Sequence, residues 1–288
     1  MGNVGLHTHG RVVNEFGSCM TYDGEHGIGQ WISEAATDHA IRIARESGVA
    51  MVTVRDSTHF GACAWWAQKI ARAGFIGIVM CNATPLVAPW QGRERMLGTN
   101  PICMAVPGPE TFLLDMATTT VALNRIYKAI ISGDKSIPEG WAMDKDGNPT
   151  TDPQTAADGL PMPLGGYKGY GLAVMVEVLC AVLSGGAMLT ELGGIRTPGK
   201  RMRASHFFMA IDVARFMPRE EFVRRMEFVR DTLTHSQPAA GFDEVLIAGV
   251  PEWRTEETRR LHGVPVAKGI WDQLGALAGS LGVEVPPI

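Results

Sequence analysis

Helix-like segments alternate with short apolar strands between residues 36 and 81, and this alternation limits the possible folds more than any other feature of the sequence. Ala40, Ile41 and Ala44 recur at helical spacing, and Gly48 follows them as a stop signal. The pattern predicts helices over 36–47 and 61–73 and buried strands over 49–54 and 75–81. A strand–helix–strand unit of this kind favours an α/β fold in which at least some strands pair in parallel.

The rest of the chain continues this mixture. We expect further strands over 102–106, 112–115, 206–213 and 244–248, and helices over 119–132, 169–184, 218–235, 268–281 and around Glu256. The helix over 169–184 is predicted to be buried in the core, because its apolar stretch is shorter than the roughly 20 residues that cross a bilayer. The helix over 218–235 is amphipathic and is expected to bury Phe222, Met226, Val229 and Leu233. The stretch 193–200 is predicted to be a mobile loop.

The composition is that of a globular protein. A chain of 288 residues that is 45% hydrophobic and 19% charged excludes disordered and coiled-coil classes. The net charge of −4 disfavours a nucleic-acid partner, and no segment predicts membrane insertion. The five cysteines form no C-x-x-C motif, which indicates buried thiols in a reducing, cytoplasmic setting. No domain boundary stands out, so we expect residues 1–288 to form a single unit.

Several standard motifs are absent. Gly27-Ile28-Gly29-Gln30 lacks the third glycine of a G-x-G-x-x-G dinucleotide loop and follows no predicted strand. Neither a G-x-x-x-x-G-K-[ST] phosphate loop nor a G-x-S-x-G nucleophile turn occurs. His7 and His9 form an i, i+2 pair, but surface histidines near a terminus are a simpler interpretation than a metal site. We therefore predict no metal.

His59 is the first candidate for chemistry. It follows the predicted strand 49–54 and precedes the helix 61–73, and ligands of α/β sheets gather at the carboxyl ends of strands. The partial positive charge of a helix N-terminus disfavours an imidazolium and keeps a histidine neutral, as a proton acceptor requires. The alternative is that His59 only caps the helix or packs in the turn.

Two loops supply further candidates. Thr99 follows a loop rich in proline, glycine and arginine, in which Arg93 or Arg95 is suited to pairing with a carboxylate. The alternative is a turn in which Asn100-Pro101 only redirects the chain. Lys168 lies among glycines at the start of the apolar helix, where exposed amides and one cation form an anion site. The alternative there is a flexible entry to a core helix.

Five groups of residues, in order along the chain, resemble the type 2 malate/L-lactate dehydrogenase family. They are Asp56–Ala62, Pro85–Pro89 with Leu97–Pro101, Leu114–Thr118, Ile137–Ala142 with Pro149–Pro153, and Gly166–Leu172. This family of NAD(P)-dependent oxidoreductases includes ureidoglycolate and sulfolactate dehydrogenases. The resemblance implies a small 2-hydroxy or 2-oxo acid substrate, NAD or NADP as cofactor, and a homodimer. It also implies a non-Rossmann mixed sheet flanked by helices, which fits the missing glycine motif.

The resemblance also implies roles for individual residues. His59 matches the family's catalytic histidine, and Thr99 matches a substrate-contacting threonine. The positions that match cofactor contacts lie in a cofactor-binding core over about 75–215, and they are Asp115, Met116, Ala117 and Lys168. Ala83 stands where some members have a cofactor-contacting serine, so a backbone contact is expected there instead.

An N-terminal segment of the family, with a Ser-His-Gly tripeptide and an arginine, is expected to be missing, since Gly10-Arg11-Val12-Val13 already matches the family's next segment. Thr8-His9-Gly10 resembles the tripeptide but lies too close to Asp23-Gly24. Without the family's arginine, Arg93 and Arg95 remain the candidates for binding a substrate carboxylate.

The favoured function is hydride transfer, in which the C2 hydride of a 2-hydroxy acid passes to nicotinamide C4 and the hydroxyl proton passes to neutral His59. One rival is a catalytically impaired homologue that still binds the nucleotide, and another is a structural remnant that binds nothing. Trp65 and Trp66 suit a dimer interface, or alternatively straddle the edge of the core.

Overall fold

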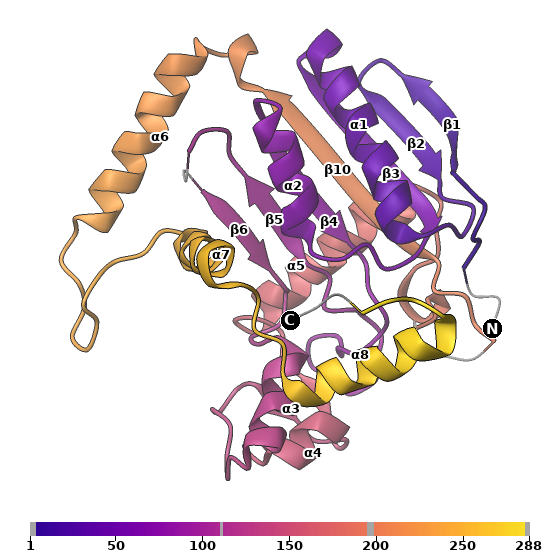
Figure 1. Cartoon of the computed structure of the whole chain (residues 1–288), viewed down its shortest axis with the longest axis vertical. Coiled ribbons are helices and arrows are strands. Elements are labelled where there is room, and N and C mark those ends of the chain that lie inside the picture. The colour runs from indigo at the N-terminus through magenta and orange to yellow at the C-terminus, as the bar shows by residue number, and fades with distance from the viewer. Residues whose placement is uncertain (1–3, 110–111, 195–198, 286–288) are drawn as a thin grey trace.

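The computed structural model describes residues 4–109, 112–194 and 199–285. Its centre is a seven-stranded mixed sheet with the order β1-β2-β3-β10-β4-β5-β6 and helices on both faces (Figure 1). The strands are β1 (Arg11–Phe16), β2 (Cys19–Asp23), β3 (Val49–Ser57), β4 (Phe75–Cys81), β5 (Ile102–Ala105), β6 (Leu113–Met116) and β10 (Ala204–Asp212). The expected α/β class with a mixed sheet is confirmed.

Helices α1 (Gly29–Ser47) and α2 (Cys63–Arg72) cover one face of the sheet, and α5 (Tyr167–Glu177), continued by a π-helical turn at Val178–Val182, covers the other (Figure 1). A small module combines α3 (Leu123–Ser132) and α4 (Pro153–Asp158) with a second sheet of β7 (Ala142–Met143), β8 (Pro149–Thr150) and β9 (Leu160–Pro161). The last helices are α6 (Arg219–Thr234), α7 (Val250–His262) and α8 (Lys268–Leu281), and short 3₁₀ turns occur at Leu189–Glu191 and Val213–Arg215.

Strand β10 separates β3 and β4, the two strands of the predicted strand–helix–strand unit. Both pair antiparallel with β10, so that Phe208 lies opposite Val52 on one side and Val79 on the other. The parallel pairing that we expected occurs instead between β2 and β3, which α1 connects. Strand β1 escaped prediction because all six of its residues are exposed, which leaves no alternation of apolar and polar positions to detect.

Three expectations about burial and strands are wrong. The helix over 169–184 packs Ala173, Val176 and Cys180 into the core, but its other side is exposed, at Val174 and Val182 among others. Helix α6 forms where predicted, yet none of its residues is buried within this chain. Residues 244–248 form no strand. Of the stretch 193–200, residues 195–198 lie outside the described residues, so the predicted mobile loop stays a prediction.

Other expectations are met at the level of single side chains. Cys63, Cys81, Cys103 and Cys180 are buried as expected, and all five cysteines are free thiols, but the expectation of burial is wrong for Cys19, which is exposed. Trp66 is buried and Trp65 is exposed, so the pair straddles the edge of the core. Across the described segments, no helix combines the length and apolar character that a membrane span requires.

Candidate active site

The register of the sheet gathers the predicted site segments at one edge. Strands β3 and β4 both end there, β10 begins there, and the pairing of Ile102 with Met80 and with Met116 places the start of β5 and the end of β6 beside them. The predicted residues that adjoin these strand ends are His59, Ala83, Thr99, Met116 and Ala117. Strand ends that converge in this way are the usual place for a ligand in an α/β sheet.

Hydrogen bonds connect these segments to one another. The amide and the hydroxyl of Thr118 both donate to the Thr99 carbonyl oxygen, at 2.9 and 3.0 Å. The Thr118 carbonyl oxygen accepts from the Leu164 amide at 2.9 Å, just before α5 begins. The Asp115 carboxylate accepts from the Ala64 amide at 2.8 Å, in the first turn of α2. Thr99, the 115–118 segment and the starts of α2 and α5 are therefore joined directly.

His59 is exposed, and its ring is oriented by the backbone of the same turn. The Gly61 amide donates to Nδ1 of His59 at 3.1 Å, so the proton of the neutral ring lies on Nε2. A doubly protonated ring has no lone pair for this amide, so the contact must open whenever His59 becomes charged. Both neighbours in the chain, Thr58 and Phe60, are buried.

Thr58 ties this turn to the start of α1. Its hydroxyl accepts from the Gly29 amide at 2.8 Å and donates to the Gly27 carbonyl at 3.1 Å. A Cβ at Gly29 would lie 2.4 Å from the carbonyl oxygens of both Thr58 and His59. A side chain at position 29 would therefore prevent the close packing of α1 against the His59 turn. Contrary to the sequence-based expectation, Gly27 and Gly29 do follow a strand, because β2 ends at Asp23.

Phe60 fixes the other side of the turn. Its ring stacks on His206 of β10, with centroids 4.3 Å apart and an interplanar angle of 6°, and its carbonyl oxygen accepts from the Trp66 indole at 3.1 Å. His206 is 1% exposed, and its burial lowers the pKa to about 3, with nearby His59 adding to the shift. Neither ring nitrogen of His206 has a hydrogen bond of ordinary geometry among the described residues. A contact with the Thr58 backbone raises the pKa of His206 and so offsets part of the lowering.

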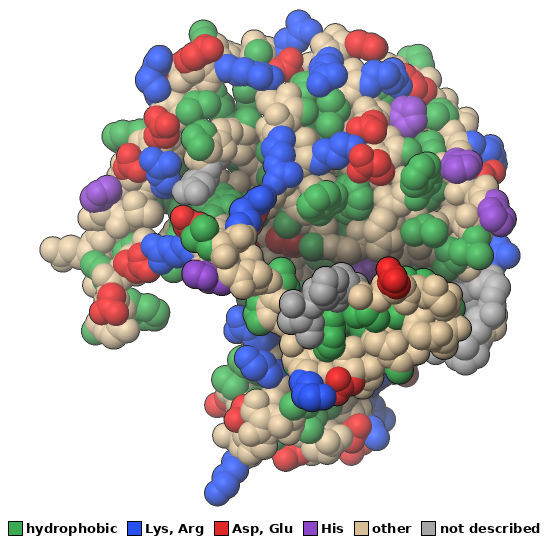
Figure 2. Space-filling model, in the orientation of Figure 1, with side chains coloured by type: hydrophobic (Ala, Val, Ile, Leu, Met, Phe, Trp, Pro, Cys, Tyr) green, Lys and Arg blue, Asp and Glu red, His purple; other side chains and the backbone are tan. Residues whose placement is uncertain are grey.

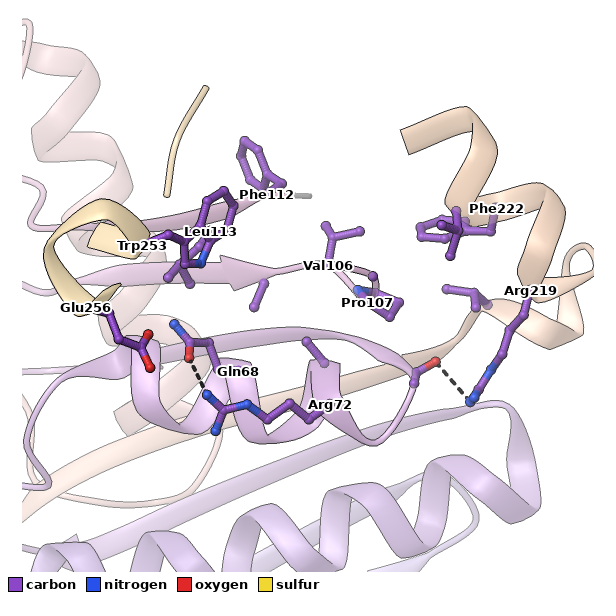
Figure 3. Close-up of a pocket in the computed structure, with 16 residues that line it drawn as sticks. Gln68, Arg72, Val106, Pro107, Phe112, Leu113, Arg219, Phe222, Trp253 and Glu256 are labelled. Carbon is purple, nitrogen blue, oxygen red and sulfur yellow. Dashed lines mark hydrogen bonds between the residues drawn. The ribbon is translucent and has the colours of Figure 1, made fainter. Parts of the chain in front are cut away.

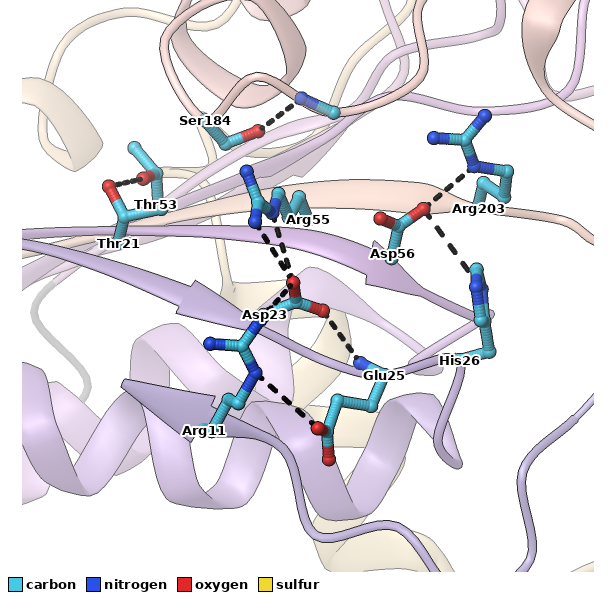
Figure 4. A network of polar contacts seen from close by, with 11 residues as sticks. Arg11, Thr21, Asp23, Glu25, His26, Thr53, Arg55, Asp56, Ser184 and Arg203 are labelled. Carbon is cyan, nitrogen blue, oxygen red and sulfur yellow. Dashed lines mark hydrogen bonds and ion pairs between the residues drawn. The ribbon is translucent and has the colours of Figure 1, made fainter. Parts of the chain in front are cut away.

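Ion pairs hold the neighbouring strand ends (Figure 4). Arg203 Nε donates to the Asp56 carboxylate at 2.7 Å, and Arg55 Nη2 donates to Asp23 at 3.0 Å. Burial opposes ionisation of Asp23, but the Glu25 amide and the Arg55 guanidinium hold the pKa of this carboxyl below its usual value. Asp56 and Arg203 have left-handed φ angles of 49° and 54°. Residues with strained backbone angles of this kind occur most often at functional sites.

Lys168 lies exposed in the first turn of α5, where the backbone suits an anion. Gly165 and Gly166 have left-handed φ angles of 59° and 67°, and no side chain caps the helix. Trp90 packs so closely on Gly166 that a Cβ there would lie 2.9 Å from the indole ring. Within the described part of the chain Lys168 forms no ion pair, so its ammonium group and the helix start fit the phosphate of a nucleotide.

Arg93 and Arg95 bind the small module. Arg95 Nη2 donates to the carbonyl oxygens of Asp158 and Gly159 at 3.2 and 2.8 Å, and Arg93 Nη1 lies 3.7 Å from Asp146. Both guanidinium groups therefore have partners already, and their role in binding a substrate carboxylate stays a prediction.

A cavity of about 490 Å³ lies at the opposite edge of the sheet, between α2, α6 and α7 (Figure 3). Phe112, Phe222 and Trp253 line it together with Arg72 and Arg219. None of the predicted site residues lines this cavity, so it is separate from the candidate site. The described residues also contain no cluster of three or more His, Cys, Asp or Glu side chains that could hold a metal ion.

Sequence reasoning missed four buried polar residues at the site edge: Asn82, Glu177, His206 and, except as a turn former, Asn100. No motif marks them, because their partners come from distant parts of the chain. Only the position of Asn82, Asn100 and His206 near strand ends could have drawn attention to them, and Glu177, at the end of α5, lacks even that signal.

Comparison with known proteins identifies the family. A family model described as malate/L-lactate dehydrogenase matches residues 1–275. The chain belongs to this family. It is 38% identical to the L-sulfolactate dehydrogenase of Methanocaldococcus jannaschii, over 99% of this chain and 82% of that protein, and the solved structure of sulfolactate dehydrogenase from this organism superposes with a TM-score of 0.91 over 98% and 81% of the two chains.

Two further family members show the range of named activities. A malate dehydrogenase of Pyrococcus horikoshii is 38% identical over 98% of this chain and 80% of its own length. A ureidoglycolate dehydrogenase (NAD(+)) of Escherichia coli is 35% identical over 91% and 75%. The chain is thus a dehydrogenase of the malate, lactate, sulfolactate or ureidoglycolate type.

Proposed function

We propose that this chain exchanges a hydride between NAD or NADP and a small 2-hydroxy acid, with His59 as the group that takes up or releases the proton. The observation that supports this most directly is the convergence of His59, Thr99, Ala83 and the 115–117 segment at one sheet edge. We further propose that the cofactor-binding core comprises residues 75–215, because these residues contain most of the converging loops.

The residues at this edge fit a dinucleotide. Lys168 and the uncapped start of α5 would hold a phosphate, and the loop at Ala83 offers backbone rather than a hydroxyl. A bound nicotinamide ring would supply the acceptor for the C2 hydride. The name of the E. coli relative, ureidoglycolate dehydrogenase (NAD(+)), also states nicotinamide use for that protein.

His59 completes the proton balance of the reaction. In oxidation the substrate hydroxyl loses its proton to Nδ1 of His59, which carries the one lone pair of the neutral ring, and in reduction the imidazolium returns a proton to the 2-oxo oxygen. The exposed ring is accessible to substrate, while Thr58 and Phe60 hold the backbone on either side of it. The Gly61 amide is released when the ring gains its second proton.

The test compares the wild-type protein with His59→Ala. Fluorescence titration with NADH and NADPH measures cofactor binding, and turnover is measured on malate, lactate, sulfolactate and ureidoglycolate. His59→Ala should lose on the order of 10²–10⁴-fold in turnover while the cofactor Kd changes little, because the ring acts in chemistry rather than in binding. His262→Ala, at an exposed histidine of α7, is the control. Cofactor binding without turnover in the wild type would instead support an impaired homologue, and unchanged turnover in His59→Ala would remove His59 from the mechanism.

We also propose that the chain forms a homodimer in the cytoplasm, where its free thiols would stay reduced. Helices α6, α7 and α8 bury no residue within the chain. Large apolar side chains are therefore left exposed, among them Phe228 and Leu233 of α6 and Ile270 and Leu274 of α8. Figure 2 shows apolar side chains at the surface of the α6–α7 arm and a hollow between the main body and α8. Exposed apolar surface on this scale is typical of an interface.

A further inference from the structure

Glu177 is a buried carboxylate without a cation. It lies on α5, is 4% exposed, and forms no ion pair with any described residue. Taking such a group out of water is costly unless hydrogen-bond donors replace the water. Two asparagine side chains provide these donors: Asn82 Nδ2 lies 3.3 Å from Oε2 of Glu177, and Asn100 Nδ2 lies 3.1 Å from Oε1.

Each asparagine amide is also fixed by the backbone. Asn100 Nδ2 donates to the Ala173 carbonyl at 3.0 Å, and its Oδ1 accepts from the Ala83 amide at 3.0 Å. Asn82 Nδ2 donates to the Ala187 carbonyl at 3.0 Å, and its Oδ1 accepts from the Ser205 amide at 2.8 Å. Because donors face acceptors at every contact, neither amide can be turned over without losing its partners.

The network ends at the predicted binding segments. Asn82 precedes Ala83, Asn100 follows Thr99, and the helix that carries Glu177 begins at the turn that carries Lys168. Asn100 has a left-handed φ of 31°, a conformation that asparagine tolerates better than most residues. The carboxylate therefore joins the loop after β4, the loop before β5 and α5 in one buried arrangement.

We propose that Asn82, Asn100 and Glu177 are positioning residues that fix the backbone at Ala83 and Thr99 in the geometry that receives cofactor and substrate. The inference rests on the proposed function, since it takes these two segments to be the binding surfaces. A purely structural role would require only that the buried groups be satisfied, whereas this network also hydrogen-bonds the Ala83 amide directly.

The test exchanges donor and acceptor across one contact. In Glu177→Gln the new amide group must face one of the asparagine amide groups, donor against donor. In Asn100→Asp two carboxylates face each other, while Oδ1 can still accept from Ala83. The double variant Glu177→Gln/Asn100→Asp restores a donor opposite an acceptor and keeps the total charge, and the glutamine oxygen still accepts from Asn82. The donor to the Ala173 carbonyl is lost, and a carboxylate oxygen faces this carbonyl instead, so the rescue is incomplete.

Two readouts are used. Hydrogen exchange reports on the Ala83 amide without any ligand, and steady-state kinetics with titration of NADH or NADPH report on binding. Glu177→Gln should speed exchange at Ala83 by about tenfold or more and raise the KM of cofactor and 2-hydroxy acid by a similar factor, with a smaller loss in kcat. The double variant should recover a measurable part of both effects, because only the contact with the Ala173 carbonyl stays unfavourable.

Val176→Ala is the matched control, because it weakens the core beside Glu177 without touching the network. It should lower Tm but leave Ala83 exchange and both KM values near wild type.

The proposal is overturned if Glu177→Gln behaves like Val176→Ala, or if the double variant is no better than the single one. If Glu177→Gln does not fold, a folded double variant with a protected Ala83 supports the proposal, and a double variant that also fails to fold contradicts it. A wild-type protein without turnover would refute the proposed function alone, since Ala83 exchange is read without it.

Discussion

His206 shows how a single buried residue supports the candidate base. Its ring stacks flat on Phe60, the residue next to His59, so β10 sets the position of the turn through an aromatic contact rather than a hydrogen bond. A charged ring there would be strongly disfavoured, because burial lowers the pKa of His206 to about 3. The contact therefore depends on His206 staying neutral.

This neutrality predicts a pH-dependent stability. The folded-state pKa lies below the unfolded value of about 6.5, so the unfolded chain binds more protons at mildly acidic pH, and the free energy of unfolding falls as pH decreases through this range. Relative to His206→Phe, which keeps an aromatic ring without titration, the wild type should lose roughly 1 kcal/mol per pH unit below about 6.5. Urea unfolding at pH 7.5 and 5.5 measures the difference. An equal pH dependence in wild type and His206→Phe would contradict the prediction.

Lys168 is expected to act in binding rather than in chemistry. It is an exposed cation beside an uncapped helix start, and nothing described in the structure pairs with it. Lys168→Ala should raise the apparent KM of the cofactor more than it lowers kcat. Initial-rate measurements at varied NAD and NADP give both values, with Lys145→Ala in an exposed turn as control. A larger fall in kcat than rise in KM would indicate a catalytic lysine instead.

At the scale of elements, α2 depends on a cap from another part of the chain. Ala62 at its N-cap has no side chain that can accept a hydrogen bond, and Asp115 of β6 accepts from the Ala64 amide in its place. Loss of solvent raises the pKa of the Asp115 carboxyl; the Ala64 amide opposes the rise, and Glu252 adds to it. The cap connects the sheet edge to the helix that follows His59.

Removing this cap should therefore destabilise the chain even without cofactor. Asp115→Ala should lower the free energy of unfolding by about 1 kcal/mol, whereas Asp115→Asn keeps an acceptor and most of that stability. Urea unfolding of the cofactor-free protein separates this effect from any contact with a ligand. Asp243→Ala, in an exposed loop, should have little effect, and a wild-type stability in Asp115→Ala would show that the cap is not needed.

The same scale explains what the sequence can predict. Strands β3 and β4 and helix α2 follow from local periodicity, and His59 is detectable because a strand-to-helix junction is local as well. The insertion of β10 depends on residues that are distant in sequence, and the two-residue strands β7, β8 and β9 are too short to show any period. The Glu177 network joins residues 77 and 95 positions apart, so no spacing rule could reveal it.

At the scale of the whole molecule, the C-terminal helices α6, α7 and α8 stand out because none of their residues is buried within the chain. The exposed apolar residues of α8 recur at i, i+4, i+7 and i+11 and share one face: Ile270, Leu274, Leu277 and Leu281. The opposite edge of the sheet adds the open cavity between α2, α6 and α7 (Figure 3). A second copy of the chain that covers such surfaces would bury them as a stable dimer does.

This apolar face of α8 is expected to hold the two copies together. Ile270→Asp/Leu274→Asp should convert the proposed dimer to a monomer, because two carboxylates on the face would lose their water on association. Light scattering coupled to size exclusion gives the mass, and circular dichroism confirms that the helices remain. Ala276→Asp is the control, since Ala276 is exposed on another side of α8 and should leave the mass unchanged. If the wild type is monomeric at micromolar concentration, or the double variant stays dimeric, then α8 does not use this face for association, and its apolar residues need another explanation.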